Sequence, residues 1–118
     1  MNKYTFTYKP ICCQGDEKTY EGHVVLRVPS IDERLDLMSR IGVEINKDGE
    51  IELPKAQLLM SKNLISESWK FYEEVKLKCL ADGQEFGSVD DLKFYPQLTS
   101  IATEVSRLLL NGIRPGKN

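Results

Sequence analysis

The feature that most restricts the fold is a pair of alternating segments within the first 28 residues. Residues 4–8 (YTFTY) place an aromatic ring at every second position, with threonines between the rings. Residues 24–28 (VVLRV) also alternate, and Pro29 stops them because proline cannot donate to a ladder. With residues 14–17 as a polar turn, the pattern predicts an antiparallel hairpin from about Tyr4 to Val28. An isolated hairpin is only marginally stable in water, so it must pack on helices or pair with another strand.

A capping box follows the hairpin. Ser30 and Glu33 have the spacing at which each side chain bonds the backbone of the other residue. This predicts a helix from Ile31 to Ile41, closed by Gly42. The face expected to be buried holds Ile31, Leu35, Met38 and Ile41.

The middle of the chain allows two interpretations at two places. Residues 43–53 alternate around a turn sequence, which fits either a second small hairpin or an exposed loop with apolar anchors. A helix is expected from Pro54 to about Phe71. Residues 75–79 then alternate, which favours a strand over continuation of the helix through Leu80.

The C-terminal third ends in a strongly amphipathic helix. The sequence from Ser88 to Asp91 resembles a capping signature and predicts a short helix, which Pro96 interrupts or restarts. The last helix is expected to close at Asn111 and Gly112. Its apolar stripe consists of Leu98, Ile101, Ala102, Val105, Leu108 and Leu109.

These segments predict an α+β fold. An N-terminal antiparallel β-hairpin is followed by three to four helices, with possible additional short strands near 43–53 and 74–80. The chain has 118 residues, 41% of them hydrophobic, which is enough for one core without a disulfide or metal. We therefore expect a single domain over 1–112 and a flexible C-terminal tail over 113–118.

Charge and hydropathy narrow the classes of partner. The 16 basic and 18 acidic residues are interleaved, apart from a short basic tail, so the clustered cations of a nucleic-acid-binding protein are not found. Apolar runs do not exceed three residues, whereas a membrane span needs about 20. The first residues lack the apolar core of a signal peptide, so we expect a cytoplasmic protein.

The thiols and the imidazole do not form a recognisable reactive motif. Cys12, Cys13, Cys79 and His23 are all that the chain contains. Adjacent cysteines lack the spacing of zinc ligands, and strand alternation would direct them to opposite faces. A contact of a cysteine with His23 is possible, but no third residue to orient the pair can be named. We expect one buried and one exposed thiol near a turn, with Cys79 in the core.

Neither the adjacent acidic residues nor the glycines of the chain indicate a catalytic or phosphate-binding site. Asp90 and Asp91 suit a helix N-terminus, and neither they nor Glu73 and Glu74 can be assigned to a cleft. No phosphate-binding glycine motif occurs. We therefore predict a protein that is not an enzyme, with no catalytic, metal or cofactor-binding residues; a small enzyme or metal-binding regulator is the least favoured alternative.

Apolar residues are too broadly spread on two of the predicted helices for a single stripe. The middle helix and the last helix both show this breadth, which fits either a central core helix or a face that binds another protein. The candidate partner-binding residues are Leu58, Ile65, Trp69, Tyr72 and Leu109.

The order of these segments resembles a known family. Residues 24–42 (VVLRVPSIDERLDLMSRIG) and 75–112 (VKLKCLADGQEFGSVDDLKFYPQLTSIATEVSRLLLNG) look like the small tail assembly chaperones of long-tailed bacteriophages and prophages. The resemblance implies a non-enzymatic protein that coats the hydrophobic, helical tape-measure protein in the host cytoplasm and recruits tail tube subunits. Many members of that family are made together with a longer, frameshifted form. The alternative is a structural subunit of a phage tail or head–tail connector that forms homo-oligomers.

Overall fold

The computed structural model describes residues 4–41, 44–45, 51–52 and 57–112, with side chains for residues 4–40 and 63–112. The fold is α+β. The strands are β1 (Thr5–Tyr8), β2 (Tyr20–Arg27), β3 (Glu44–Ile45), β4 (Ile51–Glu52), β5 (Tyr72–Cys79) and β6 (Glu85–Phe86). The α-helices are α1 (Ile31–Ile41), α2 (Gln57–Ser68), α3 (Val89–Phe94) and α4 (Thr99–Asn111). Short 3-10 helices are η1 (Ile11–Cys13), η2 (Trp69–Phe71) and η3 (Pro96–Leu98).

The main sheet has the order β1-β2-β5-β6, and each neighbouring pair is antiparallel. The predicted hairpin is confirmed, with Thr5 opposite Arg27 and Tyr8 opposite Val24. The extra partner that this hairpin requires is β5, so the strand interpretation of residues 75–79 is also confirmed. Strands β3 and β4 form a separate antiparallel pair, in which residues 44–45 lie opposite residues 51–52. This pairing confirms the interpretation of the segment as a second small hairpin.

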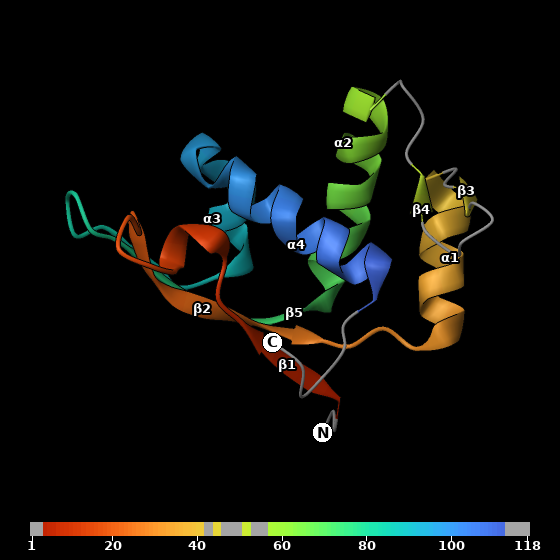
Figure 1. Ribbon diagram of the computed structural model, residues 1–118, viewed down its shortest axis with the longest axis horizontal. Coiled ribbons are helices and arrows are strands. Elements are labelled where there is room, and N and C mark those ends of the chain that lie inside the picture. Colours follow the sequence, from red (N-terminus) through yellow and green to blue (C-terminus); the bar gives the residue numbers. More distant parts are fainter. Residues whose placement is uncertain (1–3, 42–43, 46–50, 53–56, 113–118) are drawn as a thin grey trace.

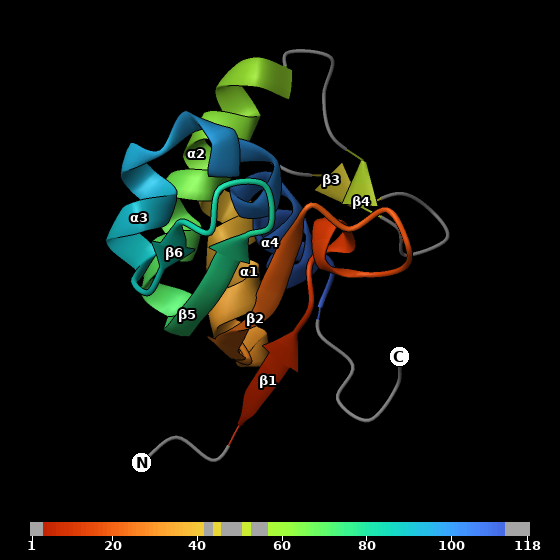
Figure 2. The same cartoon turned by 90° about the vertical axis from the view of Figure 1, so that its left-hand side faces the viewer.

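One face of the main sheet is covered by α2, α3 and α4, and α1 stands beside α2 and α4 (Figures 1 and 2). Strand alternation directs apolar side chains to this covered face and charged ones to the other, as the periodicity predicts. The core between sheet and helices contains Val24, Leu26, Val75, Leu77, Phe86, Leu98, Ile101, Val105 and Leu109.

Helix α1 has the predicted bounds but a different buried face. The Ser30 hydroxyl accepts the Glu33 amide at 3.1 Å, and the Glu33 carboxylate accepts the Ser30 amide at 2.9 Å, so the capping box is formed. The prediction that Ile31 and Leu35 are buried is wrong, because their side chains are 79% and 52% exposed. Tertiary contacts set the rotation of the helix. In particular, the Arg34 guanidinium donates to the Leu110 carbonyl of α4 at 2.6 Å.

Two helix ends differ in detail from expectation. Ser88 precedes α3 but makes no side-chain capping bond; the Asp91 carboxylate instead accepts the Gly87 amide at 2.9 Å. Helix α4 ends where predicted, with Gly112 at φ 93° and its amide bonded to the Leu108 carbonyl. The predicted start of α2 at residue 54, the cap at residue 42 and the tail over 113–118 lie outside the described residues.

Candidate functional site

Two of the predicted partner-binding residues form an apolar ridge at the end of α2. Ile65 and Trp69 are four residues apart, which places them on the same side of consecutive turns, and both are partly exposed. The centroid of the Trp69 ring lies 5.9 Å from that of Tyr72 and 5.8 Å from the Lys93 ammonium. The ridge therefore borders α3, where a cation lies beside its largest ring.

The other predicted residues lie elsewhere. Leu109 is fully buried in the core, which explains its place in the apolar stripe of α4 without a partner. The Tyr72 hydroxyl is buried and has no hydrogen-bond partner in the described part of the chain, and burial raises the pKa of this phenol. Leu58 belongs to α2, but its side chain is not among those described. A partner-binding role for Leu58, Ile65, Trp69 and Tyr72 stays a prediction.

Sequence reasoning missed three exposed apolar residues on the described α-helices. Ile31 and Leu35 of α1 form a second ridge with the same four-residue spacing, and Phe94 at the end of α3 is 79% exposed. The four-residue spacing of Ile31 and Leu35 is present in the sequence, but this spacing is also typical of a helix face that is buried in the core. Only the rotation of α1 against α4 shows that this ridge faces outward.

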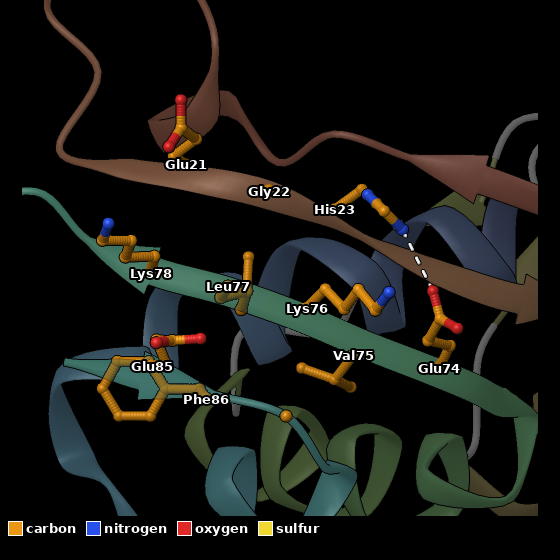
Figure 3. A pocket seen from close by; sticks show the side chains of 11 residues that line it. Glu21, Gly22, His23, Glu74, Val75, Lys76, Leu77, Lys78, Glu85 and Phe86 are labelled. Carbon is orange, nitrogen blue, oxygen red and sulfur yellow. Dashed lines mark hydrogen bonds and ion pairs between the residues drawn. The ribbon is translucent and has the colours of Figure 1, made fainter. Parts of the chain in front are cut away.

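The uncovered face of the sheet carries an open groove of about 640 Å³ along β2, β5 and β6 (Figure 3). Charges of opposite sign face each other across the strands: Glu21 pairs with Lys78, and Lys78 pairs with Glu85. The His23 ring reaches diagonally to Glu74, with 3.1 Å between His23 Nε2 and Glu74 Oε2 (Figure 3). Apart from His23, the ionisable side chains of the groove are three carboxylates and two lysines, so charges of opposite sign are interleaved across it.

The groove holds an imidazole and a carboxylate but no hydroxyl or thiol. None of the eleven side chains that line it is a serine, threonine, tyrosine or cysteine. The His23–Glu74 pair therefore has no hydroxyl or thiol within the groove that it could activate as a general base. The charged side chains of this sheet face are suited to polar contacts with the surface of another molecule. Their cross-strand pairs also stabilise the sheet.

A partly buried polar cluster holds the connection between β1 and β2 against α4. The Glu104 carboxylate accepts the Tyr8 hydroxyl and the Ile11 amide, the latter at 3.0 Å and 3.2 Å to its two oxygens. Burial and then the Glu104 carboxylate raise the pKa of the Tyr8 phenol. One side chain of α4 thus fixes both the end of β1 and the first amide of η1.

The adjacent cysteines lie in η1, within the connection between β1 and β2 and not in either strand. Cys13 is buried and Cys12 partly exposed, while Cys79 is partly exposed and packs against the core. Burial raises the pKa of Cys13 to about 12 and also raises that of Cys12. Both thiols are therefore protonated at neutral pH and are weak nucleophiles. His23 points to the other face of the sheet, toward Glu74.

Within the described residues, no three His, Cys, Asp or Glu side chains are grouped closely enough to hold a metal ion. None of the described helices has the length and apolar character needed to cross a bilayer. No protein-family model, curated protein or solved structure matches this chain. The functional proposal therefore rests on surface features of the molecule: two apolar helix ridges and a sheet face on which charges of both signs are interleaved.

Proposed function

We propose that this protein is a non-enzymatic, protein-binding assembly factor, and specifically a tail assembly chaperone of a long-tailed phage or prophage. In this proposal it binds the hydrophobic helical tape-measure protein in the host cytoplasm, keeps it soluble and recruits tail tube subunits. The family is proposed from the sequence resemblance over residues 24–42 and 75–112.

The observation that carries the proposal is the outward-facing ridge on α1. Ile31 and Leu35 are 79% and 52% exposed, although the core beneath the helix is closed by Leu37 and Met38. Apolar residues four apart form the kind of ridge that packs into the groove of another helix. An exposed apolar ridge of this kind suits a client that is itself an apolar helix. The ridge of Ile65 on α2 and Trp69 on η2 offers a second apolar contact.

Co-expression with a tape-measure fragment tests the proposal. The fragment is expected to be more soluble with this protein than without it, and the double variant Ile31→Ser/Leu35→Ser is expected to lose that effect. Both side chains are largely in solvent, so the double variant should fold normally. Leu80→Ser is the matched control, because Leu80 is also exposed but lies in the turn after β5.

Three outcomes decide the matter. Solubility that depends on the α1 ridge but not on Leu80 supports the proposal. Equal loss with Leu80→Ser would show a general effect of surface hydrophobicity and not a binding ridge. A fragment that is no more soluble with the protein than without it contradicts the chaperone function.

A structural subunit of a phage tail or head–tail connector is the second candidate. The observation that favours it is the outer edge of β1, which pairs with no second strand in the described part of the chain and so offers backbone groups to another chain. It predicts stable homo-oligomers that persist on dilution.

A further inference from the structure

The first strand forms an edge of the main sheet. In the described part of the chain, β1 pairs only with β2, whereas β2 and β5 each have two neighbours. Figure 2 shows β1 at the lower border of the molecule, with no described strand or helix beyond it. The opposite edge, β6, is only two residues long and so offers little backbone for pairing.

The hydrogen-bond register shows which residues of β1 face outward. The Val28 amide donates to the Tyr4 carbonyl at 2.7 Å, so Tyr4 and Val28 form a hydrogen-bonded pair of the antiparallel ladder. Such pairs alternate along a ladder, which directs the backbone groups of Phe6 and Tyr8 toward β2. The N–H and C=O groups of Thr5 and Thr7 consequently point away from the sheet.

Within its four residues this strand lacks the features that normally prevent strands from pairing; Lys9 and Pro10 follow it directly. Residues Thr5–Tyr8 include no charge and no proline, and their register with β2 is continuous. Natural edge strands are usually protected by lysine, proline or a bulge. Threonine and aromatic residues also favour extended structure.

The residue order of this edge is symmetric. The segment Tyr4-Thr5-Phe6-Thr7-Tyr8 reads the same in both directions. A two-fold axis through Phe6 therefore places Thr5 opposite Thr7 of a second chain and Phe6 opposite its own copy. Because Thr5 and Thr7 are the outward-facing residues, this register lets them exchange both backbone hydrogen bonds on each side of the axis.

We propose that β1 is a homodimer interface, in which two copies of this chain pair their first strands antiparallel about Phe6. The two main sheets then become one continuous sheet, with the interface using the same patch on both chains. The occupant is a second copy because the segment is uncharged and is its own complement in this register. Phe6 lies on the helix-covered side, where its ring stacks with Tyr8 at 6.2 Å between centroids, so an aromatic contact forms across the axis.

Paired charge substitutions test both the interface and its register. Thr5→Lys/Thr7→Lys places lysine opposite lysine across the axis, whereas Thr5→Lys/Thr7→Glu places lysine opposite glutamate. Both threonines are exposed, so each double variant should fold. Sedimentation velocity of the full chain is expected to show a dimer for the unmodified protein. The dimer should be weakened roughly tenfold or more by the first variant and retained by the second.

A monomer at every concentration, or equal behaviour of the two variants, would overturn the inference. Amide hydrogen exchange of the unmodified protein gives an independent measurement: the Thr5 and Thr7 amides should be protected in proportion to the dimer present. Exchange of these amides at the rate of free peptide groups would contradict the interface. The inference does not depend on chaperone activity, because a monomer that still solubilises the tape-measure fragment would refute only the dimer.

Discussion

Replacing Gly22 with alanine should disrupt the centre of the sheet. Gly22 lies in β2 opposite Leu77 of β5, with φ at +128°, a conformation that residues with a side chain rarely adopt. A Cβ atom at this position would lie 1.9 Å from the Lys76 carbonyl oxygen and 2.9 Å from its carbon. These obstacles are backbone atoms of the neighbouring strand, so no side-chain rotation can relieve the contact.

The size of the effect follows from two terms. Holding a non-glycine residue in such a conformation costs about 1–3 kcal/mol. A contact at 1.9 Å must open by more than an ångström to reach the closest approach that real Cβ atoms show, 3.0 Å. That movement breaks at least one ladder hydrogen bond, worth about 1 kcal/mol. We therefore expect a loss of at least about 3 kcal/mol, a large part of the 5–15 kcal/mol that stabilises a typical domain.

Urea unfolding followed by circular dichroism measures this loss. Gly87→Ala is the matched control, because Gly87 follows β6 and a Cβ there meets no atom within 4 Å. The control should change the free energy of unfolding by no more than about 0.5 kcal/mol. If Gly22→Ala stays within about 1 kcal/mol of the unmodified protein, the described pairing of β2 with β5 is refuted.

Four further predictions concern the Glu104 contacts, the cap of α1 and the cysteines. Glu104→Gln should lower the free energy of unfolding in urea by about 1–3 kcal/mol, because the Tyr8 hydroxyl and the Ile11 amide lose a charged acceptor. An unchanged free energy of unfolding would show that these two hydrogen bonds are not formed in solution. Ser30→Ala should cost about 1 kcal/mol by the same method, and a neutral result would contradict the capping box. In thiol labelling followed by mass spectrometry at pH 8, Cys12 and Cys79 should react before the buried Cys13. Folding raises the pKa of Cys13 from 9.0 to about 12. The contribution of this thiol to the free energy of unfolding is therefore present below pH 9 and is lost as the pH rises toward 12. A free energy of unfolding that stays constant between pH 9 and 12 would contradict the burial of Cys13.

The parts of the fold that could be predicted have local causes. The capping box between Ser30 and Glu33 fixed the start of α1, and period-two alternation identified β5 despite the competing helix. The pairing of β2 with β5 could not be predicted, because nothing in either strand specifies a partner about 50 residues away. Such pairing depends on which faces the helices cover.

The candidate surface was harder to predict for a related reason. Apolar residues that spread widely around a helix do not show which face is buried and which is exposed. The sequence therefore predicts partner binding for Leu109, although its side chain is buried. For the same reason Ile31 and Leu35 were assigned to the core although they face outward. The contact that decides their orientation, from Arg34 to the Leu110 carbonyl, joins residues 76 positions apart.

The central claim is that this protein binds an apolar helical client through its exposed helix ridges. Isothermal titration calorimetry of the full chain with a soluble helical segment of a tape-measure protein tests it most directly. The account predicts saturable binding with a negative heat-capacity change, as burial of apolar surface requires, and weaker binding by Ile31→Ser/Leu35→Ser than by Leu80→Ser. Absence of binding to the segment, or binding that both variants leave unchanged, would contradict it.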